Sequence, residues 1–159
     1  MMRIDFSQGN FMEIFIKHYT ELTRDELYEI LRARAEVFVV EQNCPYQDLD
    51  QKDIDAYHVY MKEDGEIVGY LRVLKRGVSY DDAGSIGRVI TTAKGRGRGI
   101  GLALVLEGIK VAKECFGEEK LIISAQKYAV GFYEKAGFHR TEKEYLEDGI
   151  PHLQMRLGF

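Results

Sequence analysis

A basic, glycine-rich stretch, KGRGRGIG at residues 94–101, has the composition of a polyphosphate-binding loop. Its alternating glycines allow the backbone to turn tightly, so that several N–H groups can face one anion. The cations Lys94, Arg96 and Arg98 lie between these glycines. An apolar, helix-like segment starts at Ile100, and the N-terminus of a helix adds a positive pole. Because ordered segments flank the stretch, we predict a phosphate site here rather than a merely flexible basic loop.

Two common phosphate-binding motifs do not fit this stretch. A Walker loop would end in Gly-Lys-Ser/Thr, whereas Gly101 is followed by Leu102. The dinucleotide motif G-x-G-x-x-G fails at its third glycine, where Ile100 or Leu102 stands. The pattern that does fit is Arg-x-x-Gly-x-Gly over residues 96–101.

This pattern resembles the pyrophosphate loop of the GCN5-related N-acetyltransferase (GNAT) superfamily. Downstream, the strand-like LIISAQ at 121–126 precedes FYEKAGF at 132–138, which resembles the second hallmark of that superfamily. The segments RAEVFVVEQNCPYQD at 34–48 and EDGIPH at 147–152 resemble the ElaA-type branch. The resemblance runs from about residue 12 to residue 159 and implies a fold and a cofactor, acetyl-CoA or CoA. It does not supply the acceptor.

The resemblance assigns the cofactor to the glycine-rich loop and to the strand before it. Loop N–H groups would hold the pyrophosphate, and the strand backbone at 88–91 would pair with the pantetheine arm and stabilise the oxyanion. As side chains, Val89 and Ile90 fit the core. The asparagine often found after the second strand is not visible, and Gln126 stands in that region. The predicted cofactor-binding residues are Val89, Ile90, Thr91, Arg96, Gly97, Arg98, Gly99, Ile100, Gly101 and Gln126.

The same resemblance places Tyr133 near the cofactor sulfur, where it could donate to the departing thiolate. A reference pKa near 10 against about 8.5 for a thiol makes full proton transfer uphill, so hydrogen-bond donation is the better interpretation. Tyr133 could also pack on Phe138 at the end of a helix, and the two roles can coexist.

Deprotonating an amine requires a base or a water chain. Four residues are candidates, and the sequence does not choose among them: Glu41, His58, Asp148 and His152. Glu41 ends the apolar run VFVVE, where desolvation would raise its pKa, although a surface acid is the alternative. His58 fits a buried structural histidine better than a base. We retain Tyr133, Glu41 and His152 as predicted catalytic residues. The scattered histidines and the two cysteines fit no metal spacing, so no metal is expected.

An acidic segment follows the first predicted helix. Asp48, Asp50, Asp53 and Asp55 crowd one loop near Glu41. Such a cluster repels itself unless it is solvated or paired with a cation. One hypothesis is therefore a positively charged primary amine as acceptor, either a small molecule or a lysine-like group, and the alternative is a solvated loop.

Composition limits the remaining classes. A length of 159 residues fits one domain, with residues 1–11 as a flexible lead-in and 12–159 as the acetyltransferase domain. A net charge of −4 argues against general nucleic-acid binding. The apolar runs are too short to span a membrane, and no signal peptide is visible. We expect a cytoplasmic protein and leave homodimerisation open.

The elements that must position these residues follow from periodicity and turn signals. A capping box at Thr23 starts a helix, and Asp64-Gly65 and Asp148-Gly149 predict hairpins. The strand–loop–helix–strand over 84–126 is long enough for a crossover, so its two strands should be parallel. We predict a single α/β domain with a mixed, mostly antiparallel sheet flanked by helices.

The sequence thus predicts direct acetyl transfer from acetyl-CoA to a primary amine. Cys44 has no neighbour that would lower its pKa, which disfavours a covalent acyl-enzyme. A coenzyme A-binding sensor or interaction module without catalysis is the alternative, and thioester hydrolysis is a third.

Overall fold

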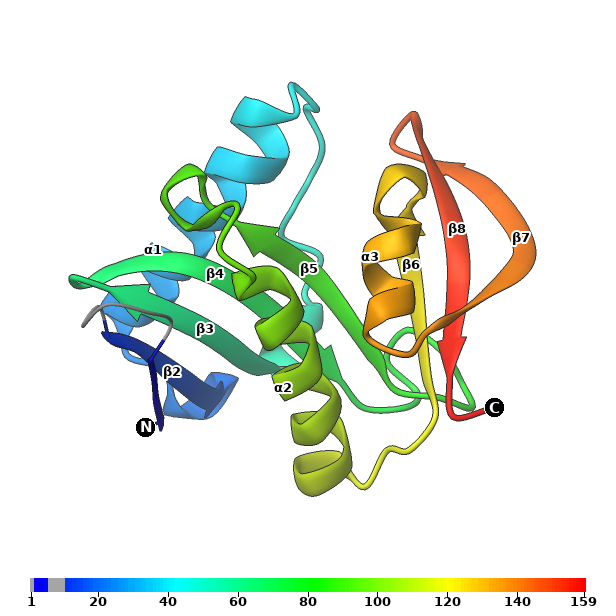
Figure 1. The fold of residues 1–159 in the computed structure, drawn as a ribbon, viewed down its shortest axis with the longest axis horizontal. Coiled ribbons are helices and arrows are strands. Elements are labelled where there is room, and N and C mark those ends of the chain that lie inside the picture. Colours follow the sequence, from blue (N-terminus) through cyan, green and yellow to red (C-terminus); the bar gives the residue numbers. More distant parts are fainter. Residues whose placement is uncertain (1, 6–10) are drawn as a thin grey trace.

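The computed structural model describes residues 2–5 and 11–159, and contains two antiparallel sheets and three α-helices (Figure 1). The first sheet has the order β1-β2-β3-β4-β5 and the second the order β6-β8-β7. The strands are β1 Met2–Asp5, β2 Phe11–His18, β3 Tyr57–Glu63, β4 Glu66–Leu74, β5 Ser85–Thr91, β6 Leu121–Gln126, β7 His139–Glu147 and β8 Ile150–Leu157. The α-helices are α1 Arg24–Ala35, α2 Ile100–Phe116 and α3 Val130–Lys135.

The N-terminus differs from the sequence prediction. We predicted a flexible lead-in over residues 1–11, but Met2–Asp5 form strand β1, which pairs with β2. The backbone ladder between these strands joins Met2 to Ile14 and Asp5 to Phe11. This part of the lead-in therefore belongs to the edge of the first sheet, while residues 1 and 6–10 of the predicted lead-in lie outside the described residues.

The two sheets meet at one point. Gly84 forms a parallel bridge with Leu121, in which its N–H donates to the Lys120 carbonyl and its own carbonyl accepts from the Ile122 N–H, both at 3.0 Å. The predicted parallel pairing of β5 and β6 is thus confirmed only at the Gly84–Leu121 bridge. Beyond this bridge the two strands diverge (Figure 1). A Cβ atom at Gly84 would lie 2.9 Å from the Leu74 carbonyl oxygen, so this close approach requires glycine. The predicted mixed, mostly antiparallel α/β fold is confirmed.

The helices begin and end where local rules predict. The Thr23 side chain accepts from the Glu26 N–H, and the Glu26 carboxylate accepts from the Thr23 N–H, which completes the capping box of α1. Helix α1 continues into a π-helical segment, Glu36–Glu41. Helix α2 ends at Gly117, whose φ of +69° is left-handed. In the described part of the chain, no helix has the length and hydropathy needed to cross a membrane.

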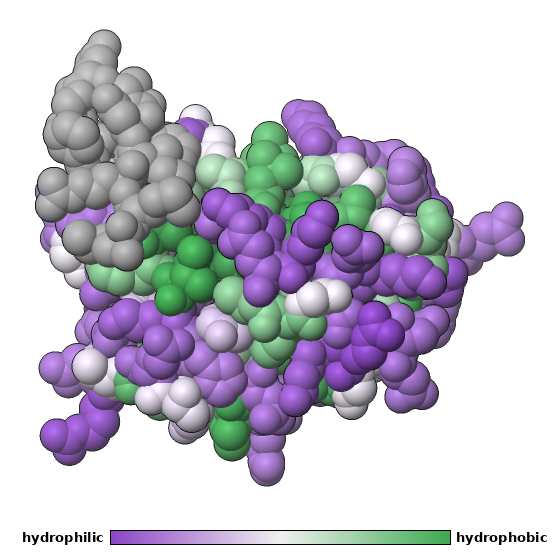
Figure 2. Space-filling model, turned by 90° about the horizontal axis from the view of Figure 1, so that it is seen from below, coloured by the Kyte–Doolittle hydropathy of each residue, from purple (hydrophilic) through white to green (hydrophobic). Residues whose placement is uncertain are grey.

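Each face of the first sheet has its own apolar core. On one face, α2 packs against β3, β4 and β5, and residues such as Val59, Leu71 and Leu104 are fully buried. On the other face, Ile30 of α1 packs with Tyr60 and Tyr70. Hydrophilic residues predominate on the side that Figure 2 shows, where they divide the hydrophobic surface into separate patches.

Candidate active site

The divergence of β5 and β6 leaves a cavity of about 610 Å³ between the two sheets. Its walls come from the π-helical segment, β5, the start of α3 and the β6–β8 side of the second sheet. A second cavity, of about 340 Å³, lies at the glycine-rich loop. Thr91, Arg96, Gly101 and Phe132 line both cavities, so the two are adjacent.

Twelve of the thirteen predicted site residues line these cavities. The larger cavity is lined by Glu41, Val89, Ile90, Thr91, Arg96, Gly101, Gln126, Tyr133 and His152. The smaller one adds Gly97, Gly99 and Ile100. Only Arg98 lies outside both.

The glycine-rich loop presents backbone donors at the start of α2. Gly99 is the N-cap residue, with a left-handed φ of +74° that favours glycine. No side chain caps this end of α2, and its first turn contains no acidic residue. The N–H groups of this turn are therefore available to an anion, and the helix dipole favours one there.

The cations of the loop are placed differently from the prediction. Arg98 donates from Nη1 and Nη2 to the two carboxylate oxygens of Glu63, at 2.7 and 2.9 Å, and lowers the pKa of that carboxyl group. This pair fixes the loop to the end of β3, and Arg98 lies outside both cavities, so its assignment to the cofactor stays a prediction. Lys94 lies 3.5 Å from Glu66 on β4. Of the three loop cations, Arg96 alone lines the cavities.

Arg96 stands at the junction of the two cavities. Its Nε donates to the Thr91 carbonyl at 3.1 Å, and its Nη2 is paired with the carboxylate of Glu41. Both side chains are partly exposed, Arg96 at 49% and Glu41 at 28%. The predicted base Glu41 is thus in the cavity, but its carboxylate is engaged by a cation that belongs to the phosphate loop.

The position of Tyr133 allows both of the roles that the sequence left open. The Phe138 N–H donates to the Tyr133 carbonyl at 3.2 Å and Gly137 has a φ of +102°, which is the Schellman end of α3. The Tyr133 ring lines the larger cavity at the same time. Burial raises the pKa of Tyr133, which makes complete loss of its proton still less favourable.

His152 has the geometry of a base. Its side chain is 7% exposed, and its Nδ1 lies 2.7 Å from the Ile150 carbonyl oxygen, so Nδ1 carries a hydrogen. In the neutral ring Nε2 then has the free lone pair. Glu147 lies 3.3 Å from Nε2 and lines the same cavity, where it can pair with the imidazolium that forms.

The remaining base candidates separate clearly. His58 lies outside the cavity. Both of its ring nitrogens are engaged elsewhere, with the Tyr70 hydroxyl at 2.8 Å and the Asp53 carbonyl at 3.0 Å. Burial lowers the pKa of His58. Asp148 lines the cavity at the tip of the β7–β8 hairpin. The structure therefore places Glu41, Asp148 and His152 in one cavity and excludes His58.

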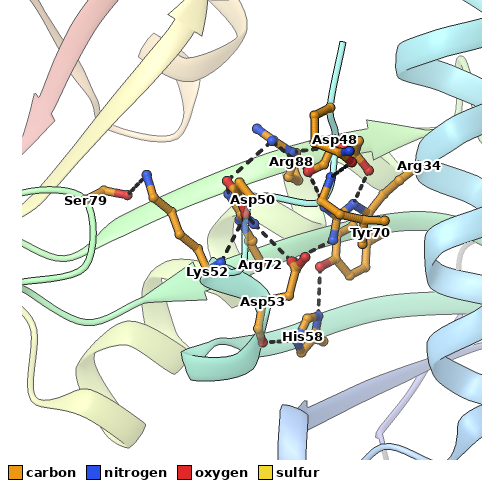
Figure 3. A network of polar contacts seen from close by, with 12 residues as sticks. Arg34, Asp48, Asp50, Lys52, Asp53, His58, Tyr70, Arg72, Ser79 and Arg88 are labelled. Atoms are coloured by element: carbon orange, nitrogen blue, oxygen red, sulfur yellow. Dashed lines mark hydrogen bonds and ion pairs between the residues drawn. The ribbon is translucent and has the colours of Figure 1, made fainter. Parts of the chain in front are cut away.

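The acidic loop does not serve the predicted purpose. Three of its aspartates alternate with three arginines in a closed ring of six ion pairs, with N–O distances of 2.6 to 3.4 Å (Figure 3). In ring order, the members of this arginine–aspartate ring are Arg34, Asp48, Arg88, Asp50, Arg72 and Asp53. Asp55, the fourth acid of the loop, is exposed. Since the three ring carboxylates are already neutralised, the hypothesis that this cluster binds a cationic acceptor is wrong.

Several residues around the cavities were missed by sequence reasoning. Lys135 and Phe132 line the smaller cavity, and Tyr46, Arg88 and Glu147 line the larger one. Lys135 lies within FYEKAGF, three residues after Phe132, and this spacing places the two on one face of α3. Arg34 also carried a signal, because it falls four residues after Ile30 on the apolar face of α1 and is fully buried. A buried arginine requires a counter-ion.

The fold and the sequence match known proteins. A family model described as an acetyltransferase (GNAT) domain matches residues 19–159. Protein ElaA of Escherichia coli strain K12 is 39% identical over 142 residues, which are 87% of this chain and 91% of that protein. A solved acyl-CoA N-acyltransferase from Pseudomonas aeruginosa has a TM-score of 0.85 at 38% identity, over 92% of this chain and 99% of the other. The crystal structure of Escherichia coli ElaA has a TM-score of 0.84 at 35% identity, with the same coverage.

The architecture is therefore that of the acyl-CoA N-acyltransferases. The chain belongs to the GNAT acetyltransferase family, in its ElaA-type branch.

Proposed function

We propose that the protein is an acetyl-CoA-dependent N-acetyltransferase that transfers the acetyl group directly to a primary amine. The observation that carries this proposal is the pair of adjacent cavities. One presents the uncapped start of α2, and the other is lined by Tyr133 and His152. An elongated molecule with phosphates at one end and a reactive group at the other fits such a site.

Bound acetyl-CoA would supply an activated acetyl group as a thioester. Backbone N–H groups from Gly97 to Gly101 would hold its phosphates, and hydrogen bonds to charged groups contribute roughly 1.5–3 kcal/mol each. The backbone of Val89, Ile90 and Thr91 lines the larger cavity and would pair with the amide-rich arm. The acetyl group of the bound cofactor would lie between this wall and Tyr133.

Residues of the second sheet and of α3 would carry out the proton transfers and the hydrogen bonding. Nε2 of His152 would accept a proton from the amine, and Glu147 would stabilise the imidazolium. Tyr133 would donate a hydrogen bond to the departing thiolate rather than its proton, because burial raises the tyrosine pKa further above that of a thiol. A proton from the acceptor ammonium then neutralises the departing thiolate, so that CoA leaves as the thiol.

Direct transfer agrees with the position of Cys44. Its thiol lines the cavity but is directed to the Asp148 carbonyl oxygen, with an Sγ–O distance of 3.7 Å. A carbonyl cannot take up the thiol proton, so the side chain has no activating base at this contact.

Calorimetric titration with CoA tests the cofactor site. We expect binding by the wild-type chain and loss of binding in Gly99→Asp, because a carboxylate would then face the phosphates. Aspartate tolerates the left-handed backbone better than most residues, which limits damage to the fold. An equal affinity for CoA in this variant would show that the loop does not bind the phosphates.

Thiol release from acetyl-CoA in the presence of a panel of primary amines tests the reaction. Amine-dependent release supports the transferase. CoA binding without release from any amine would favour the alternative, a coenzyme A-binding module without catalysis. Release that does not depend on the amine would indicate thioester hydrolysis.

Tyr133→Phe tests the hydrogen bond to the thiolate. The ring and its packing on Phe138 remain, while the hydroxyl is lost. We expect kcat to fall about tenfold or more, with the Kd for CoA little changed, since general acid–base groups contribute roughly 10²–10⁴. Unchanged turnover at unchanged stability would leave Tyr133 only its Schellman role.

A further inference from the structure

The arginine–aspartate ring is balanced in charge and lies directly behind β5. It contains three arginines and three aspartates, and each member is paired with two others. Arg34 is fully buried, and the Arg72 side chain is 4% exposed. Hydrogen bonds and charge from these two arginines lower the pKa of Asp53, against the effect of its burial. A closed, neutral ring has no spare charge with which to bind a substrate. Its function must therefore lie in the parts of the backbone that it holds in place.

One member of the ring has an unusual backbone. Arg88 lies in the middle of β5 with a φ of +50°, a left-handed conformation that side chains other than glycine rarely adopt. The strand register explains why. Tyr70 pairs with Ile90 while Arg72 pairs with Gly87, so Arg88 and Val89 together face the single intervening residue of β4. This is a β-bulge, and the extra residue leaves the backbone ladder.

The side chain of Arg88 anchors this bulge to the ring. Its Nε donates to Oδ1 of Asp48 at 2.8 Å, and its Nη2 donates to the Asp48 carbonyl at 3.0 Å. Its guanidinium also lies over the Tyr46 ring, 5.6 Å from the centroid. Asp48 is held in turn by Arg34 of α1, with a distance of 2.9 Å between Nε and Oδ2. The left-handed residue is thus connected to a helix on the other side of the loop (Figure 3).

The bulge is also part of the cavity wall. Arg88, Val89 and Ile90 line the larger cavity, and Tyr133 of α3 lines it as well. Backbone donors that stabilise developing charge must be fixed before the reaction, because reorientation would reduce their effect. A bulge in a strained conformation can supply such donors only if another part of the fold holds it in place.

We propose that Arg88 is a positioning residue, which holds the β5 bulge through Asp48 so that its backbone N–H groups face the acyl group. This inference rests on the proposed acetyl transfer. Arg88 itself does not touch the reacting atoms. Its contribution is the direction of the amides at Val89 and Ile90.

Arg88→Gly separates the anchor from the backbone conformation. Glycine adopts a φ of +50° without strain, so the bulge can still form but is no longer fixed. Arg88→Lys keeps the charge but cannot form the two-armed contact with Asp48. Arg76→Ala is the matched control, because Arg76 forms the same kind of arginine–carboxylate contact with Glu118, at 2.9 Å, outside both cavities.

We expect kcat of Arg88→Gly to fall about 10²-fold, in the range found for loss of one oxyanion donor. The Kd for CoA should change by less than about threefold, because most of the affinity resides in the phosphates. Arg88→Lys should lie between this variant and the wild type, and Arg76→Ala should retain wild-type kcat. Wild-type kcat in Arg88→Gly would overturn the proposal. So would a joint loss of kcat, CoA affinity and melting temperature, which would indicate a role in folding alone.

Amide NMR shifts provide a readout that does not depend on turnover. CoA should shift the N–H signals of Val89 and Ile90 in the wild-type chain and shift them less in Arg88→Gly. Equal shifts in both proteins would overturn the positioning role, even if no amine in the panel were acetylated. In that last case the proposed reaction would fail on its own assay, so the two failures are distinguishable.

Discussion

One group of arginines lies around the middle of β5, and a second group lies in the loop that follows the end of this strand. Arg34, Arg72 and Arg88 belong to the arginine–aspartate ring, where every guanidinium bridges two aspartates. Arg96 and Arg98 belong to the glycine-rich loop, where each guanidinium pairs with one glutamate. Side-chain exposure in the ring does not exceed 25%, whereas Arg96 is 49% exposed.

The difference decides which ions can change partners. Removing one partner from a buried pair leaves an uncompensated charge in the interior, which is strongly destabilising. An exposed pair contributes about 0–1 kcal/mol, so it can open at little cost. The ring therefore fixes the wall of the cavity, while Arg96 can exchange Glu41 for a phosphate. Both regions pair arginines with carboxylates, and the difference in burial separates their functions.

Asp53→Asn should produce the largest effect. This substitution removes the charge that Arg34 and Arg72 share, and breaking a buried pair costs about 3–5 kcal/mol. The free energy of unfolding, measured with urea, should fall by that amount. Lys94→Ala, at an exposed pair of the loop, is the control and should change it by less than about 0.5 kcal/mol. Similar losses of unfolding free energy in the two variants would contradict the difference between the arginine–aspartate ring and the glycine-rich loop.

Arg96→Ala should have the opposite profile. Loss of one charge-assisted contact to a phosphate corresponds to roughly 1.5–3 kcal/mol, or about 10- to 150-fold in the Kd for CoA. The free energy of unfolding should stay close to that of the wild type, because the pair with Glu41 is exposed. Titration calorimetry and urea unfolding of the same preparation measure both quantities. A stability loss as large as that of Asp53→Asn would show that the loop is as fixed as the ring.

The pH dependence of stability should report the ring and its neighbour His58. Burial lowers the pKa of His58 in the folded chain, so the unfolded chain takes up this proton first as the pH falls. Stability should therefore decline below about pH 6.5, with a slope of at most about 1.4 kcal/mol per pH unit. The arginines lower the pKa of Asp50 and Asp53, so their contribution is lost only below about pH 4.

His58→Gln should remove the first decline and leave the second. Urea unfolding at a series of pH values distinguishes the two. Persistence of the decline below about pH 6.5 in this variant would assign it to another group.

Glu41→Gln should have the smallest effect, and in the favourable direction. Arg96 would no longer have to leave a carboxylate, so the Kd for CoA should fall by about two- to fivefold at low salt. The gain should shrink in high salt, and it should be absent in the Arg96→Ala background. A gain that survives without Arg96 would show that Glu41 acts on the cofactor directly.

Sequence reasoning succeeded where the determinants are local. The capping box at Thr23, the hairpin turns at Asp64-Gly65 and Asp148-Gly149, and the glycine-rich loop each depend on a few adjacent residues. Twelve of the thirteen predicted site residues line the two cavities for the same reason, since the motifs that carry them are continuous. Cytoplasmic localisation and homodimerisation stay predictions.

Sequence reasoning failed where charges find distant partners. Arg88 and Asp48 are 40 residues apart, and Arg34 and Asp53 are 19 apart, so no local pattern joins them. The aspartates were therefore interpreted as a site for a cationic acceptor. The pairing of Arg98 with Glu63 could not be predicted for a similar reason, because Glu63 lies 35 residues earlier in another strand. The β5 bulge depends on how two strands align and was equally invisible.

The bridge at Gly84 has a consequence for divergence within such a fold. The side chains that line the cavity can be exchanged one at a time, because each projects from an element that is supported elsewhere. The bridge at Gly84 is different, since there the backbones of both sheets meet around a residue with no space for a Cβ atom. Any substitution there must displace Leu74 and the Glu118 side chain together. We therefore expect the cavity lining to vary among descendants of this chain long before the glycine that joins the two sheets does.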